Sequence, residues 1–134
     1  MGSIDLFNFT SDKANIPVDV VLKHPVTGMD TDVVIQIVGV DSTAAQECMD
    51  KQQAERFTAM TTSDSVAVSF DPKQNRKQLL DLLTACTVGW KNMSYNGVDL
   101  EFNSDNARMV YASVPFVRDQ INKATGSRKI FFKD

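Results

Sequence analysis

The chain has 134 residues, of which 43% are hydrophobic and 23% are charged, and its formal net charge is −3. This length and composition are those of one ordinary globular domain with enough apolar material for a single core. No apolar run is long enough to span a bilayer, and the basic residues do not cluster with aromatic residues as in a nucleic-acid footprint. We therefore expect one domain over residues 1–134 that binds neither membrane nor nucleic acid.

The charges are unevenly distributed along the chain. Residues 1–72 carry 11 acidic and 4 basic side chains, whereas residues 73–134 carry 10 basic and 6 acidic ones. Such an asymmetry can steer protein association, including head-to-tail self-association. A scattered surface pattern without function is the commoner explanation.

The N-terminal part predicts an arm followed by a hairpin. Residues 1–15 are mostly polar with isolated apolar positions, so we expect an irregular, flexible arm. The segments Val18–Lys23 and Thr31–Val38 are rich in β-branched residues, and a turn containing Pro25 and Gly28 joins them. This pattern predicts an antiparallel β-hairpin.

A helix is expected from about residue 43 to residue 59, with Asp41 and Ser42 supplying capping oxygens at its start. Its predicted inner side holds Ala45, Cys48, Met49, Phe57 and Met60, and its water-facing side holds Lys51, Glu55 and Arg56. The following residues 65–70 alternate small or polar with apolar side chains, which is typical of a short strand.

The segment from Leu79 to Phe102 is the apolar centre of the sequence. Asp71-Pro72 starts a helix whose apolar residues point in most directions, and such a helix has to be covered on more than one side. We expect this helix to end near Gly89, with Trp90 as an aromatic anchor behind it. Asn96-Gly97 then predicts a tight two-residue hairpin turn.

The C-terminal part is predicted to be helical. Asn103 or Ser104 caps a helix with an apolar seam at helical spacing: Ala107, Val110, Val114, Val117, Ile121 and Ala124. Pro115 predicts either a kink or a fresh helix, and residues 126–134 form a basic, aromatic tail that we expect to be flexible. The fold class is therefore α+β, with an N-terminal antiparallel hairpin or small sheet packed on a mainly helical C-terminal part.

The sequence offers little catalytic or metal-binding chemistry. Cys48 and Cys86 lie far apart and both fall on apolar helix faces, so we interpret them as buried thiols. His24 has no cysteine or second histidine near it, and residues 99–110 lack the glycine and glutamate of a calcium loop. We expect no catalytic, cofactor-binding or metal-binding residue, and hence no enzyme.

Two separated blocks of sequence suggest a family. The first contains Thr27-Gly28 at the hairpin turn and G-V-D-S at residues 39–42. The second contains T-V-G-W at residues 87–90, N-G-V-D-L-E-F-N-S-D-N-A-R at 96–108 and P-F-V-R-D-Q-I at 115–121. In this order and spacing, over about residues 17–124, the chain resembles the tail assembly chaperones of long-tailed bacteriophages. It departs from that family at residues 65–70, where a simpler helical connection is common.

The resemblance implies a function without chemistry. Such chaperones bind the long, apolar, helical tape-measure protein, keep it soluble, and are displaced when tail-tube subunits polymerise around it. The resemblance also implies a homo-oligomer in the host cytoplasm that is absent from the mature virion. The rival functions are a structural minor tail component retained in the virion and a small cytosolic enzyme, which would need a concave pocket with converging polar groups.

Seven apolar side chains are candidates for partner binding, and each has an alternative role. Trp90 is a core anchor or a partner contact. Met109 and Phe116 form a second apolar stripe, so their segment is either buried on two sides or presents a groove to a client helix. The tail is either a mobile end or a docking arm for a neighbouring subunit. The full set is Trp90, Met109, Ala112, Phe116, Ile130, Phe131 and Phe132.

Overall fold

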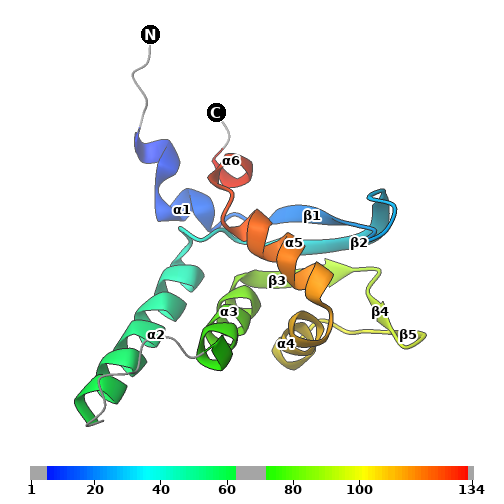
Figure 1. Cartoon of the computed structure of the whole chain (residues 1–134). Helices are drawn as coiled ribbons and strands as arrows, with labels where there is room; N and C mark the ends of the chain where they lie inside the picture. The colour runs from blue at the N-terminus through cyan, green and yellow to red at the C-terminus, as the bar shows by residue number, and fades with distance from the viewer. Residues whose placement is uncertain (1–5, 63–71, 133–134) are drawn as a thin grey trace.

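The structure is a computed structural model, and it describes residues 6–62 and 72–132. These residues form an α+β fold, which confirms the predicted class. A three-stranded antiparallel sheet has the order β1 (Val18–Lys23), β2 (Asp30–Ile37) and β3 (Thr87–Lys91), so β2 lies in the centre. Helices α3 (Pro72–Cys86), α4 (Ser104–Ser113) and α5 (Pro115–Thr125) complete the main body (Figure 1).

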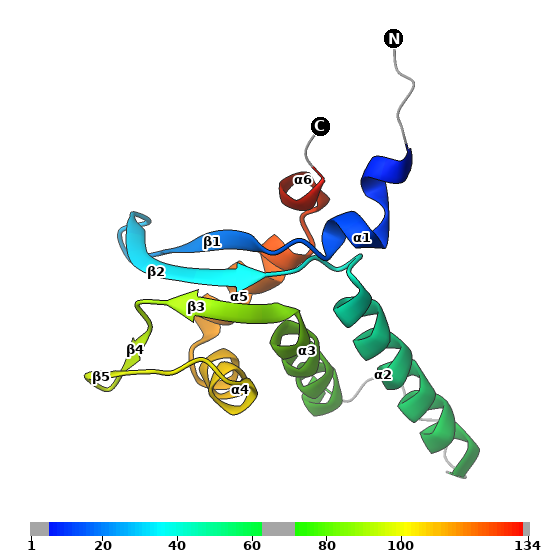
Figure 2. The ribbon, with the colours of Figure 1, turned by 180° about the vertical axis from the view of Figure 1, so that it is seen from behind.

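The predicted hairpin is confirmed as β1 and β2, and its side chains alternate between two faces of the sheet. Val20 pairs with Ile35, and Val18 pairs with Ile37. These residues face inward, since Ile35 and Ile37 are fully buried. Asp19 and Val21 point to the opposite face and are exposed, as the period of two along a strand requires. In Figures 1 and 2, α5 crosses one face of the sheet and the other face is uncovered.

The third strand was not predicted from the sequence. The leucine-rich helix ends at Cys86 and not near Gly89, so that prediction is wrong. Thr87–Lys91 pairs with β2, with Gly89 opposite Gln36 and Trp90 opposite Ile35. The side chain of Gln36 lies over Gly89, where an added Cβ would come within 2.8 Å of its Oε1 atom. The small hairpin that follows, β4 (Ser94–Tyr95) and β5 (Val98–Asp99), is confirmed.

The turn between β4 and β5 has the backbone that its sequence predicts. Asn96 and Gly97 both have positive φ, at 55° and 79°, as a two-residue type I′ turn needs. Downstream, Asn103 caps α4 by accepting a hydrogen bond from the Asn106 amide. Pro115 is the first residue of α5, so a fresh helix is the correct alternative at this position.

The core lies between the inner face of the sheet and helices α3, α4 and α5. Its buried residues include most of the predicted C-terminal seam, with Val114 and Ala124 half-buried at its sides. The cluster comprises Leu22, Ile35, Ile37, Leu80, Leu83, Met93, Ala107, Val110, Tyr111, Val117 and Ile121. Most of the side chains predicted to point inward from these helices therefore do so.

Helix α2 (Thr43–Thr62) packs on α3 and extends away from the sheet (Figures 1 and 2). Ser42 caps it by accepting a hydrogen bond from the Ala45 amide. Ala45 is buried as predicted, but Cys48 is only half-buried, so its interpretation as a buried thiol is wrong. The predicted strand at 65–70 and the side chains of residues 56–60 lie outside the described residues.

Both ends of the described chain contain short helices where we expected irregular segments. Near the N-terminus these are a 3₁₀ turn, Leu6–Phe9, and α1 (Ser11–Ala14), whose last residue is fully buried. Near the C-terminus, α6 (Arg128–Phe131) lies against the start of the sheet. The last residue of α1 and the helix α6 therefore pack on the body of the protein, whereas Leu6 and Phe7 in the 3₁₀ turn are exposed.

Candidate partner-binding surfaces

Trp90 is held on its own chain by two contacts. Its Nε1–H donates a hydrogen bond of 2.8 Å to the carbonyl of Leu100, and its ring forms a T-shaped contact with the Phe102 ring, with centroids 5.0 Å apart. Trp90 is half-buried and packs against the core cluster. These contacts support the core-anchor alternative, because the polar end of the indole is already satisfied within the chain.

Met109 and Phe116 are half-buried and pack against the same core cluster, whereas Ala112 between them is exposed. The contacts of the two large side chains favour the alternative in which this segment is buried on two sides. An exposed alanine offers little apolar area to a client. The structure therefore does not bring Met109, Ala112 and Phe116 together as an open groove.

The C-terminal candidates are attached to the body by a charge pair and a ring contact. Arg128 donates two hydrogen bonds to the Asp41 carboxylate, at 2.6 and 2.9 Å, and this contact holds the pKa of Asp41 below its usual value. The ring of Phe131 covers Gly39, where an added Cβ would come within 2.9 Å of it. Ile130 and Phe132 are half-buried. These contacts favour an intramolecular role for the tail over a free docking arm.

A groove between α2 and α3 is a further candidate surface. It has a volume of about 390 Å³, and Met49 from α2 faces Leu79 and Leu82 from α3 across it. All three side chains are half-buried and pack against the core on one side, as Met109 and Phe116 do, but they also line this groove. The remaining lining is uncharged and consists of Gln52, Gln53 and Gln78. The sequence contained a signal for this surface, because a helix that is apolar in most directions needs cover on more than one side.

The opposite side of the α2–α3 pair is a polar cleft of about 660 Å³. It is lined by Cys48 together with charged residues that include Asp81 and Arg108, which form an ion pair. Burial, with a further contribution from Asp81, raises the pKa of the Cys48 thiol. A raised pKa makes the nucleophilic thiolate rarer at neutral pH, so the surroundings of Cys48 do not activate it.

A third concavity of about 880 Å³ runs beside β1, between this strand and the α5–α6 region. Its lining mixes apolar groups, such as Val18, Val20 and Ile130, with Lys23 and Lys123. This groove therefore borders the open edge of the sheet, where backbone groups are available for hydrogen bonding.

In the part of the chain that the structure describes, no helix combines the length and the apolarity needed to cross a membrane. The same residues contain no group of three or more His, Cys, Asp or Glu side chains placed to hold a metal ion. Comparison of the chain with protein-family models, curated proteins and solved structures finds no match.

Proposed function

We propose that this protein is a phage tail assembly chaperone that binds the apolar helical tape-measure protein and keeps it soluble until tail-tube subunits are recruited. The sequence blocks at residues 27–28, 39–42, 87–90, 96–108 and 115–121 support the family. The observation that carries the binding function is the α2–α3 groove, which is lined by half-buried Met49, Leu79 and Leu82 together with three uncharged glutamines.

The chemistry of this groove suits the apolar face of a helix. Two packed helices present a channel into which a third helix can lay side chains at helical spacing. Leu79 and Leu82 are three residues apart on α3, so they project from neighbouring positions on one face. Met49 adds a flexible, polarizable side chain that can adapt to different client sequences.

Coexpression with the tape-measure protein tests the proposal. We expect Leu82→Glu to reduce the soluble, co-purifying tape-measure protein at least about tenfold, because a charge in the groove must be desolvated when an apolar helix covers it. The measurement is the amount of tape-measure protein that stays soluble and is captured with the tagged chain. A retained structural tail component would instead be detected in purified virions.

Asn75→Glu is the matched control, because Asn75 lies on the same helix and is exposed outside the groove. It should leave capture unchanged. Thermal unfolding of both variants separates a lost client contact from a lost fold. This measurement is needed because Leu82 is half-buried against a second, smaller core cluster, which consists of Val38, Ala45 and Cys86. Equal capture by folded Leu82→Glu and by the control would exclude the groove as the client site.

A further inference from the structure

The outer edge of β1 is open. In the sheet order β1-β2-β3, β1 has a neighbouring strand on one side only. Figures 1 and 2 show none of the described elements beside the middle of β1 on the other side, although α1 and α6 lie near its first residues. The groove of about 880 Å³ borders this strand over Val18 to Lys23. An additional strand therefore has space to approach.

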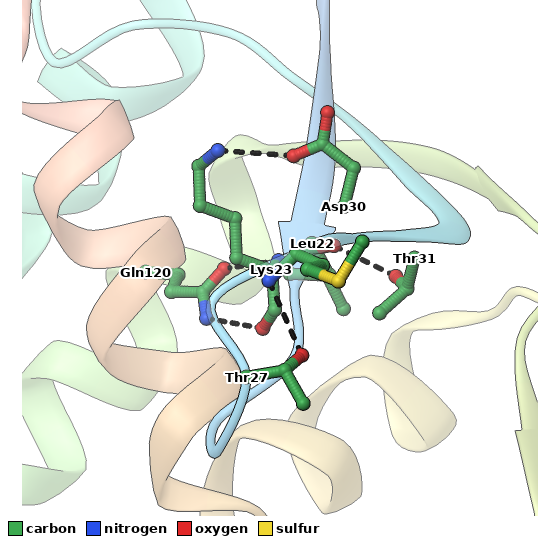
Figure 3. Close-up of polar contacts among 7 residues, drawn as sticks. Leu22, Lys23, Thr27, Asp30, Thr31 and Gln120 are labelled. Carbon is green, nitrogen blue, oxygen red and sulfur yellow. Dashed lines mark hydrogen bonds and ion pairs between the residues drawn. The ribbon is translucent and has the colours of Figure 1, made fainter.

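The hydrogen bonds of the last two residues show which backbone groups point to this edge. The Leu22 carbonyl accepts a bond of 2.7 Å from the Thr31 hydroxyl and so faces β2. The Lys23 amide and carbonyl instead bond to the side-chain amide of Gln120, at 2.9 and 2.8 Å (Figure 3). The backbone amide and carbonyl of Lys23 therefore point away from β2. Along a strand, every second residue points these backbone groups to the same side.

The backbone amides and carbonyls of Asp19 and Val21 point to the same side of β1 as those of Lys23. Between the pairs Val21–Val34 and Lys23–Asp30, β1 advances by two residues and β2 by four, so the irregularity lies in β2. The alternation along β1 is thus unbroken. None of the described residues bonds to the outward amide and carbonyl of Asp19 or Val21. The outward backbone groups of Asp19 and Val21 are therefore available to a partner strand, whereas those of Lys23 are bonded to Gln120.

We propose that a second copy of this chain occupies this edge, with the two β1 strands antiparallel about a two-fold axis at Val21. In this register Asp19 of one copy faces Lys23 of the other, and Val21 faces Val21. The backbone amide and carbonyl of all three residues point to the open edge, so these residues form hydrogen-bonded pairs between the two β1 strands. Each dimer contains the Asp19–Lys23 contact twice, because a two-fold interface repeats every contact. This inference does not depend on the proposed client.

Gln120 opposes the pairing, because its amide occupies the backbone groups of Lys23 as a neighbouring strand would (Figure 3). In each copy, self-association must exchange these two hydrogen bonds of Lys23 for two hydrogen bonds to Asp19 of the other copy. Gln120→Ala removes the competitor without touching β1. It should therefore tighten the dimer by about tenfold, whereas loss of a merely structural contact would not strengthen association.

Charge exchange tests the register by sedimentation equilibrium over a range of protein concentrations. Lys23 also forms an ion pair of 2.9 Å with Asp30 on β2, so the change at Lys23 is made together with Asp30→Lys to keep that pair. Asp19→Lys and Lys23→Asp/Asp30→Lys each place like charges opposite one another twice in the dimer, and each should weaken it by about tenfold. The triple variant Asp19→Lys/Lys23→Asp/Asp30→Lys restores opposite charges at both contacts and should recover the original dissociation constant. A chain that stays monomeric at all concentrations, or a triple variant no better than the other two, would overturn the proposal.

Cysteine cross-linking tests the position of the axis. Val21→Cys places two cysteines about 5.5 Å apart between their Cα atoms, which is within reach of a disulfide. Asp19→Cys is the control, because four residues separate its two copies along the strands, or about 14 Å. Mild oxidation should link Val21→Cys and not Asp19→Cys, with the linked peptides identified by mass spectrometry. The opposite result, or equal linking of both, contradicts this axis.

Discussion

At the scale of single residues, the centre of the core is fixed by a polar contact. Tyr111 is fully buried, and its oxygen lies 2.5 Å from the Thr87 hydroxyl. The Thr87 hydroxyl donates its hydrogen to the Leu83 carbonyl at 2.7 Å, so Tyr111 must be the donor in the contact between the two side chains. This chain of bonds ties α4 to the point where α3 becomes β3.

Tyr111→Phe should lower the free energy of unfolding by about 1 kcal/mol at neutral pH, because it removes this hydrogen bond. Burial raises the pKa of Tyr111 to about 12 from 10.0. A raised pKa means that the unfolded state loses its proton first, so the native protein loses stability between about pH 10 and 12. The loss from this group is about 1.4 kcal/mol per pH unit. Urea unfolding at pH 7 and pH 11 measures both effects.

Tyr111→Phe should keep part of the loss of stability at alkaline pH. Burial also raises the pKa of Cys86 to about 12, and this thiol is unchanged in Tyr111→Phe. The decline in stability from pH 9 upwards should therefore become shallower and not vanish. An unaltered slope between pH 10 and 12 would show that Tyr111 does not titrate as its burial predicts.

Trp90→Ala should cost about 3–5 kcal/mol of stability, because it removes a large ring from the boundary of the core. Trp90→Phe keeps most of the apolar area and loses the hydrogen bond to Leu100, so about 1 kcal/mol is expected. Denaturant unfolding of the two variants gives both values. Equal losses would mean that the indole N–H, and not the packing of the ring, makes the larger contribution.

At the scale of elements, α6 depends on the absence of a side chain at position 39. Gly39→Ala should displace the Phe131 ring that covers this glycine and detach α6. Arg128 and Lys129 then become better substrates for trypsin, because proteolysis needs a locally open chain. We expect faster cleavage at these two residues than in the native protein, measured by mass spectrometry. Gly28→Ala meets no atom within 4 Å but strains the hairpin turn, because Gly28 has a φ of 72°. It controls for a general loss of stability away from α6 and should leave cleavage at Arg128 and Lys129 unchanged.

The elements that the sequence predicted well are those with local signals. The β1–β2 hairpin, the Asn96-Gly97 turn and the fresh helix at Pro115 each follow from residue types at the position itself. Strand β3 was missed because the apolar run continues from α3 into it without a glycine or proline between them. Its pairing with β2 is a tertiary effect, although β-branched Thr87 and Val88 were a usable signal.

The candidate surfaces were harder to predict than the elements. Met109, Phe116 and Phe131 are apolar and have helical or terminal positions, but their packing partners come from distant parts of the chain. The α2–α3 groove needs two helices whose crossing cannot be read from either one alone. The apolar residues of the leucine-rich helix predicted that it is covered on more than one side, but they did not predict this groove or Met49 in its lining.

At the scale of the whole molecule, the proposed client groove and the proposed self-association edge are separate. The groove belongs to α2 and α3, whereas the edge belongs to β1 and the nearby C-terminal part of α5. A dimer formed through β1 would therefore leave both α2–α3 grooves accessible. Two grooves on one particle can bind neighbouring segments of a long helical client more tightly than one, through effective concentration.

The most direct test of the account is backbone hydrogen exchange of the protein with and without a soluble helical fragment of the tape-measure protein. We predict slower exchange in the parts of α2 and α3 that carry Met49, Leu79 and Leu82, because a bound helix covers them. Exchange in the β4–β5 hairpin should stay unchanged. Protection that is absent, or that appears elsewhere and spares α2 and α3, would contradict the claim that this groove holds the client.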